Sequence, residues 1–126
     1  ADRVEQCLPP LAEAIRRGGR QVLWCCDPMH GNTETTQHGI KTRRVENILR
    51  ELELSCSILK DCSTHLGGVH FELTGDNVTE CIGGASGVTE ADLARDYRTT
   101  LDPRLNYEQA MEMALRLARL LAQGSK

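Results

Sequence analysis

The sequence has few aromatic residues and no long apolar run. It contains one Trp, two Tyr and one Phe among its 126 residues, whereas aromatic side chains normally supply much of the buried area of a core. Because a domain of this length buries roughly two-thirds of its surface, we expect part of the core to be supplied from elsewhere. No apolar run approaches the roughly 18 residues that span a bilayer, so the sequence predicts no transmembrane segment.

The sequence also lacks any stretch rich in Lys or Arg. Its 15 Lys and Arg residues are outnumbered by 18 Asp and Glu residues, which gives a formal net charge of −3. Nucleic acids and anionic membrane surfaces are bound by concentrated positive charge. We therefore expect neither a nucleic-acid partner nor a membrane partner, and we favour a small molecule or another protein.

Six cysteines are present, but no pair has the C-x-x-C spacing, which disfavours a zinc module built from them. Most lie in apolar periodic stretches, where a thiol behaves as a small hydrophobic group, and no signal-peptide pattern opens the sequence. We therefore expect free thiols and a cytoplasmic location. Because the chain begins at Ala1 rather than Met, we also expect that it was processed or cut from something longer.

Helical and strand-like patterns alternate along the chain. In chain order they predict a helix over 8–18, a strand over 22–26, a helix over 42–61, a strand over 69–75, a helix over 89–97, a strand over 98–101 and a helix over 106–124. Thr89 with Asp92, and Asn106 with Gln109, have the spacing of helix-capping pairs. The first strand is a continuous apolar run, typical of a strand buried on both faces. The second strand alternates, which gives it one apolar and one polar face.

This alternation of elements predicts an α/β fold with parallel strands and right-handed crossovers. We find no linker or boundary, so residues 1–126 are expected to form a single domain. Three strands cannot close a barrel. The choice therefore lies between an open three-layer sheet and a segment of a (β/α) barrel.

A polar residue able to bind a metal ion accompanies each predicted strand. His30 follows the first strand, Glu72 lies on the polar face of the second, and Asp102 follows the third. Ligands bind at the carboxyl ends of parallel strands, where the loops converge, so these three side chains are expected to meet. One imidazole and two carboxylates suit a divalent ion such as Mn, Fe, Co or Zn. Taken singly, each residue also fits a capping or surface role.

Four blocks of the sequence resemble the class II 3-deoxy-D-arabino-heptulosonate 7-phosphate (DAHP) synthases. They are WCCDPMHGNT at 24–33, KTR at 41–43, GGVHFELTGDNVTECIGG at 67–84 and DPRLN at 102–106. The similarity runs in one register over nearly the whole chain. It implies the C-terminal portion of a (β/α)8 (TIM) barrel, namely its last three β/α units, and it offers a cause for the thin aromatic core.

The resemblance also implies a chemistry. The family condenses phosphoenolpyruvate with erythrose 4-phosphate, the first step of the shikimate pathway, at a divalent metal such as Mn or Co held by a Cys, a His, a Glu and an Asp. The last three ligands map onto His30, Glu72 and Asp102, and the Cys belongs to a strand outside this sequence. The metal is expected to act as a Lewis acid on the aldehyde oxygen.

Three basic residues are candidates for contact with the phosphorylated substrates. Lys41 and Arg43 are candidate catalytic and substrate-binding residues, because a guanidinium fork matches phosphate geometry; the alternative is a solvated helix N-terminus. Arg104 is expected either to bind a substrate phosphate or to pair with Glu72 or Asp102. His70 is either an outer donor to the metal site or an interior histidine, which we favour.

Two functions from different classes fit these features. The first is an enzyme component, a transferase of the DAHP synthase family that is inactive as an isolated chain and becomes active in a homo-oligomer or with a chain that supplies the missing barrel half. The second is a non-catalytic truncated homologue that acts as a binding or regulatory partner. The joint presence of the three candidate ligands with Lys41 and Arg43 favours an ancestry under catalytic selection.

Overall fold

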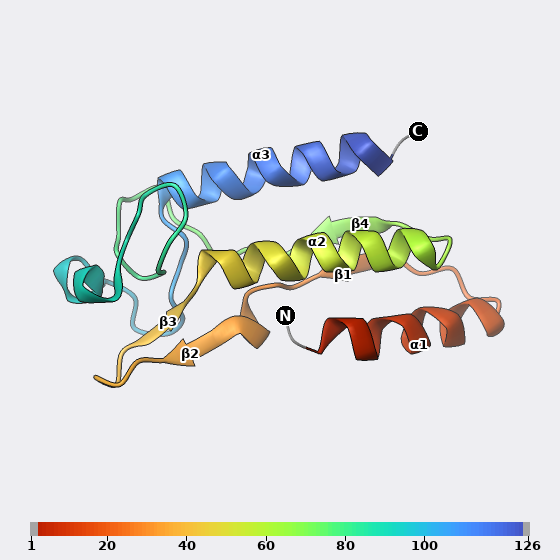
Figure 1. The fold of residues 1–126 in the computed structure, drawn as a ribbon, viewed down its shortest axis with the longest axis horizontal. Coiled ribbons are helices and arrows are strands. Elements are labelled where there is room, and N and C mark those ends of the chain that lie inside the picture. Colours follow the sequence, from red (N-terminus) through yellow and green to blue (C-terminus); the bar gives the residue numbers. More distant parts are fainter. Residues whose placement is uncertain (1–2, 125–126) are drawn as a thin grey trace.

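The structure is a computed structural model that describes residues 3–124. Ala1, from which processing is expected, lies outside these residues. In chain order the elements are α1 (Val4–Arg17), β1 (Trp24–Cys26), η1 (His30–Asn32), β2 (Thr33–Thr35), β3 (Lys41–Arg43), α2 (Val45–Asp61), β4 (Leu66–Val69), η2 (Glu90–Arg95) and α3 (Tyr107–Gly124). Helix α2 lies between α1 and α3, with β1 and β4 behind it (Figure 1). Within residues 3–124, no helix is both long enough and apolar enough to cross a bilayer.

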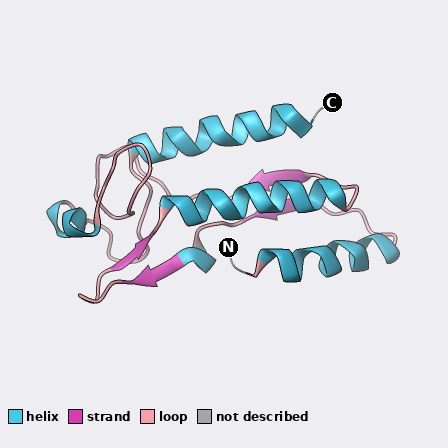
Figure 2. Ribbon diagram, viewed as in Figure 1, coloured by secondary structure: helices cyan, strands magenta, loops and turns pink. Residues whose placement is uncertain are grey.

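The strands form two small sheets (Figure 2). Strands β1 and β4 pair in parallel, with Cys26 opposite Val69, and β2 and β3 pair as an antiparallel hairpin. The chain is therefore a mixed α/β structure with parallel strands in one sheet, as predicted. The hairpin was not predicted, because its residues were assigned to a polar loop and to the start of the following helix.

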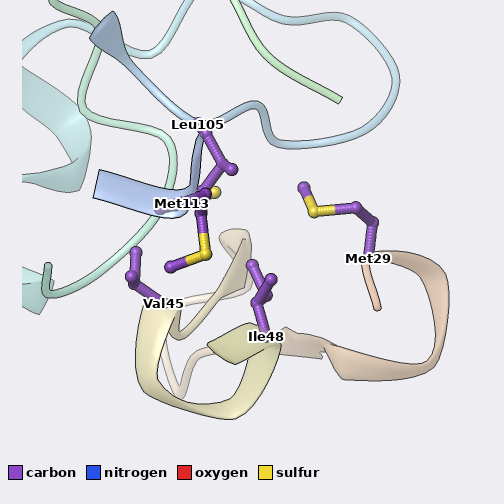
Figure 3. Close-up of a cluster of buried hydrophobic side chains, with 6 residues drawn as sticks. Met29, Val45, Ile48, Leu105 and Met113 are labelled. Carbon is purple, nitrogen blue, oxygen red and sulfur yellow. The ribbon is translucent and has the colours of Figure 1, made fainter. Parts of the chain in front are cut away.

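Helix α2 carries the centre of the core. Its buried residues recur every three or four positions, which places them on one face: they are Val45, Ile48, Leu52, Ser55 and Leu59. Val45 and Ile48 pack with Met29, Leu105 and Met113 at one end of the helix (Figure 3). Leu52 and Leu59 pack with Ala12 of α1 and with Cys26 and Leu66 of the parallel sheet.

The helices cover only one face of the parallel sheet. Cys26 is buried against them, whereas Cys25 points the other way and is exposed. Leu23, just before β1, is 73% exposed. The prediction of a first strand buried on both faces is therefore wrong, because nothing in the described part of the chain covers its second face.

The second predicted strand is shorter and earlier than expected. Strand β4 ends at Val69, and its last bond to β1 runs from the His70 N–H to the Cys26 carbonyl (2.9 Å). The partner strand turns away at Asp27 and Pro28, so the ladder has no further neighbour to pair with. Within the rest of the predicted strand, residues 70–75, one isolated parallel bridge forms, between Leu73 and Leu105.

The third predicted strand does not form at 98–101, where the backbone follows bends instead. The preceding predicted helix is the short 3-10 helix η2, and its capping pair of Thr89 and Asp92 is present. Asn106 and Gln109 also cap α3 as predicted: the Gln109 N–H donates to Asn106 Oδ1 (3.0 Å), and the Asn106 N–H donates to Gln109 Oε1 (3.1 Å).

Helix α1 begins at Val4, so Pro9 and Pro10 lie inside it and not in its first turn as predicted. Each proline lacks an N–H and leaves one helical carbonyl without its usual donor. Those carbonyls belong to Glu5 and Gln6, both of which are exposed residues. The helix ends at Arg17 with Gly18 as its C-cap, and Gly19 follows with a φ of 61°, the left-handed conformation that commonly closes helices.

Candidate metal centre

His30 is oriented by Asp27, which stands just beyond the end of β1. One Asp27 carboxylate oxygen accepts the backbone N–H groups of Met29 (3.0 Å) and His30 (3.2 Å). The other lies 2.7 Å from His30 Nδ1. A carboxylate only accepts hydrogen bonds, so the imidazole proton sits on Nδ1 and leaves the Nε2 lone pair for a ligand.

The Asp27 carboxylate is stabilised as an anion by this geometry. Partial burial acts to raise its pKa, but the hydrogen bonds from the Met29 and His30 backbone and from the His30 ring outweigh it, so the pKa of Asp27 lies below its ordinary value. Asp27 was missed in the sequence. Its spacing, three residues before a histidine and next to a proline, was a usable signal for such a turn.

His30, Glu72 and Asp102 come together as the strand-end argument expects. His30 Nε2 lies 3.4 Å from Glu72 Oε1 and 3.7 Å from Asp102 Oδ2, and one donor atom from each residue lies within 4.8 Å of the others. Ligand bonds of about 2.1 Å to one ion place neighbouring donors about 3.0 to 3.5 Å apart. The donor set and its spacing therefore fit a divalent ion after small side-chain movements.

Arg43 is fully buried beside Glu72. Its Nη1 donates to Glu72 Oε2 and to the Pro103 carbonyl (2.6 Å), and its Nε donates to Thr33 Oγ1 (3.0 Å). This burial excludes a solvated helix N-terminus for Arg43, which lies in β3. Its Nη2 is buried, has no hydrogen-bond partner among residues 3–124, and lies 3.9 Å from Asp102 Oδ2.

Lys41 neutralises the second carboxylate. Its Nζ forms an ion pair with Asp102 Oδ1, and this hydrogen bond is the main reason that the pKa of Asp102 lies below its ordinary value. The Lys41 side chain is 46% exposed, and its backbone carbonyl accepts a hydrogen bond from the Tyr97 hydroxyl (2.7 Å). Lys41 therefore stands at the open side of the centre, and Arg43 at its closed side.

Arg104 pairs with Glu80. Of the two alternatives left open by the sequence, a substrate phosphate or a pair with Glu72 or Asp102, the second is therefore wrong. Arg104 Nε donates to Glu80 Oε2 (3.0 Å), and its Nη2 donates to Glu80 Oε1 (2.8 Å). Glu80 itself is fully buried. Sequence analysis missed this residue because its partner lies 24 positions away and no local pattern connects the two.

The remaining histidines lie around the centre or away from it. His70 is exposed, with its ring 5.9 Å from that of His30, so the favoured interior position is wrong: it lies on the uncovered side of the sheet. A donor atom of His70 also lies within 4.8 Å of donors from Asp27 and His30. Neither His38 nor His65 joins a cluster of possible metal ligands within residues 3–124.

The fold and the site together define a mixed α/β chain with a candidate divalent-metal centre beyond the ends of parallel strands. A model of the Class-II DAHP synthetase family matches residues 1–118, and the chain belongs to this family.

Similar proteins carry a common name. The chain is 47% identical over 120 residues to a phospho-2-dehydro-3-deoxyheptonate aldolase of Neurospora crassa. It is 45% identical to the aldolase AroG of Mycolicibacterium smegmatis and 43% identical to the aldolase of Streptomyces coelicolor, again over 120 residues. These matches cover 94–95% of this chain but only 25–27% of the relatives. The chain therefore spans about a quarter of their length.

Proposed function

We propose that this chain carries the metal-binding side of an active site that condenses phosphoenolpyruvate with erythrose 4-phosphate. In this proposal residues 1–126 form the last three β/α units of a (β/α)8 barrel. The observation that supports it is the convergence of His30, Glu72 and Asp102, in a chain of this family, with Lys41 and Arg43 bonded to the two carboxylates.

His30, Glu72 and Asp102 would hold a divalent ion such as Mn or Co, which supplies Lewis-acid polarisation of an aldehyde oxygen. Each carboxylate would offer the ion the oxygen that faces His30, while its other oxygen pairs with Lys41 or Arg43, and the imidazole would add a nitrogen donor. Asp27 keeps the His30 proton on Nδ1, away from the centre. This division of roles is typical of histidine ligands that are oriented by an outer carboxylate.

Lys41 and Arg43 would bind the anionic groups of the substrates. The buried Arg43 Nη2 lacks a hydrogen-bond acceptor among the described residues, and leaving such a donor unsatisfied costs about 1–3 kcal/mol. A phosphate or carboxylate oxygen would remove that cost. Arg104 uses Nε and Nη2 on Glu80, so a substrate phosphate would meet its Nη1 as a single donor and not as a fork.

A further chain, or further copies of this one, would complete the barrel. Four apolar side chains are exposed on or near the open sheet and the Asp102 segment: Val22 (46%), Leu23 (73%), Leu73 (52%) and Leu101 (81%). Strand edges and apolar patches of this kind pair readily with other chains. We favour a complementary barrel half over a homo-oligomer, because the relatives extend over about four times this length.

Metal titration tests the centre. Mn(II) or Co(II) is titrated calorimetrically into the purified protein, together with any chain that co-purifies with it. We expect His30→Ala and Glu72→Ala to weaken binding at least tenfold, since each removes one ligand. His65→Ala is the matched control, because His65 is exposed and outside the cluster. Equal affinity in the wild type and Glu72→Ala would contradict the proposal.

Phosphate release from the two substrates in the presence of Mn(II) tests the chemistry. The isolated 126-residue chain is expected to be inactive, and the completed barrel to turn over at about 10 per second, a typical enzyme rate. Turnover at that rate by the isolated chain would contradict the need for completion. Inactivity of a completed, metal-loaded protein would favour the non-catalytic alternative.

A further inference from the structure

Asp102 lies on a segment that, among the described residues, belongs to no strand or helix. Residues 96–104, here called the Asp102 loop, run from the end of η2 to the bridge at Leu105 without regular secondary structure. Leu101, next to Asp102, is 81% exposed. The position of a candidate ligand on such a segment depends on contacts from other elements. Lys41 and Arg43 of β3 make two of them, with the Asp102 carboxylate and with the Pro103 carbonyl.

The carboxylate of Glu80 accepts hydrogen bonds from backbone N–H groups of the Asp102 loop. In a sheet, the carbonyl groups of a neighbouring strand would accept them. Glu80 Oε1 accepts the backbone N–H groups of Arg98 (3.1 Å) and Thr99 (2.9 Å), and its Oε2 accepts that of Arg104 (2.8 Å). These donors stand on both sides of Asp102 along the chain. One buried side chain thus binds the backbone of the Asp102 loop both before and after Asp102.

Glu80 is also tied to the strand that carries Lys41 and Arg43. Its backbone carbonyl accepts the hydroxyl of Thr42 (2.8 Å), and the Ile82 N–H donates to the Arg43 carbonyl (2.8 Å). Thr42 is itself fully buried. The segment 80–82 therefore connects β3 to the Asp102 loop, and with it two sides of the candidate metal centre.

The surroundings of Glu80 favour its ionised form. Burial acts to raise the pKa of Glu80, but the hydrogen bonds from the Arg104 side chain and from the backbone of Arg104, Arg98 and Thr99 outweigh it, so its pKa lies below the ordinary value. Buried ion pairs are often replaceable by apolar residues without loss of stability. An apolar residue could not accept three backbone N–H groups, which points to a role in placing the loop.

We propose that Glu80 is a positioning residue for the metal centre: it holds the Asp102 loop so that the Asp102 carboxylate reaches His30 Nε2 and Glu72. This inference rests on the proposed metal site. It is distinct from the roles of the ligands, because Glu80 acts on Asp102 through the backbone and the Arg104 side chain of the Asp102 loop, and through its link to β3.

Hydrogen exchange tests, without any metal, whether Glu80 holds the Asp102 loop in place. Exchange is followed by mass spectrometry on peptides covering 96–105, in the protein as purified with any co-purifying chain. Glu80→Gln, which keeps the shape, should speed exchange of these amides about tenfold, the factor that corresponds to one net hydrogen bond. Glu80→Ala should have a larger effect. Unchanged exchange in a folded Glu80→Gln protein would overturn the proposal.

Gln109→Ala is the matched control for lost buried hydrogen bonds. Gln109 is also fully buried, and its Nε2 donates to the carbonyls of Cys81 and Gly83, both at 2.9 Å. Within residues 3–124, its hydrogen bonds go to Asn106, Cys81 and Gly83 and not to the Asp102 loop. We expect Gln109→Ala to lower stability while leaving exchange of the Asp102 loop and metal affinity near the wild-type values.

Metal affinity then tests the link to the centre. Glu80→Gln should weaken Mn(II) binding ten- to hundredfold, the usual effect of losing a residue that supports a ligand. In an Asp102→Ala background it should cause no further loss, because the ligand that it positions is gone. Additive losses would overturn the positioning role. If the wild type binds Mn(II) and Glu80→Gln binds it equally well, the positioning role is wrong but the metal site stands. If the wild type does not bind Mn(II), both the metal site and the positioning role are wrong.

Discussion

His30 depends on one neighbouring carboxylate both for the direction of its ring and for which ring nitrogen carries the proton. Asp27 uses one oxygen to fix the backbone turn and the other to face Nδ1 of the ring. A side chain of the same shape but different hydrogen-bonding capacity would keep the turn and change the proton position. A substitution at Asp27 can therefore separate the effect of the backbone turn from the effect of the proton position on His30.

Asp27→Asn should weaken Co(II) affinity about ten- to hundredfold. The amide oxygen of Asn can still accept the two backbone N–H groups. Its NH2 group then faces Nδ1 and moves the imidazole proton to Nε2, where it blocks the lone pair that faces Glu72 and Asp102. Calorimetric titration measures the change, with Asp61→Asn, an exposed position at the end of α2, as the control. Wild-type affinity in Asp27→Asn would contradict this account.

At the scale of elements, two caps of the same type lie in contrasting surroundings. Asn106 is 3% exposed, caps α3 and also donates through Nδ2 to the Val78 carbonyl and to Ser86 Oγ, both at 3.1 Å. Thr89 caps η2 on the surface. The first cap joins a helix to the segment before η2, whereas the second acts only within its own turn.

Asn106→Ala should lower the free energy of unfolding by about 2 kcal/mol, because it removes a cap and leaves a buried carbonyl without its donor. Thr89→Ala should cost clearly less, since water can replace the exposed cap. Urea unfolding at pH 7, followed by circular dichroism, compares the two variants. Equal losses would show that burial of the Asn106 contacts adds nothing to the cap.

At the scale of the whole molecule, the main feature is the open face of the β1–β4 sheet, which no other part of the described chain covers. Cys25 and Leu23 are exposed there, while the helices cover the opposite face (Figure 1). A barrel built from further strands would continue the sheet and change this exposure. Thiol chemistry can report the change, since Cys25 stands on the strand itself.

Cys25 should react rapidly with a thiol reagent at pH 8 in the isolated chain, and at least tenfold more slowly once the barrel is completed, because accessibility limits thiol reactivity. Cys81 serves as an internal control: burial raises its pKa to about 12, so it should stay unmodified until the protein unfolds. Mass spectrometry of labelled peptides follows both sites. Equal labelling of Cys25 in the two states would argue against coverage of this face.

Local patterns in the sequence determined much of the architecture. The apolar spacing of α2, the caps at Asn106 and Thr89 and the parallel pairing of the first two strands agree with the structure. The convergence of His30, Glu72 and Asp102 was also predicted, although the strand expected before Asp102 does not form. Such features are predictable because neighbours within a few residues, or a general rule for parallel sheets, fix them.

Only the tertiary structure decided the partners of the charged residues and the form of the third site segment. Arg104 bonds to Glu80, Arg43 is buried against Glu72, and His70 faces outward. Local sequence predicts a strand in the Asp102 loop, yet among residues 3–124 the loop is part of no sheet and is held by side chains, Glu80 among them. The reason is physical: a backbone N–H or a guanidinium binds whichever acceptor the fold brings near, and that choice is set by contacts far apart in the chain.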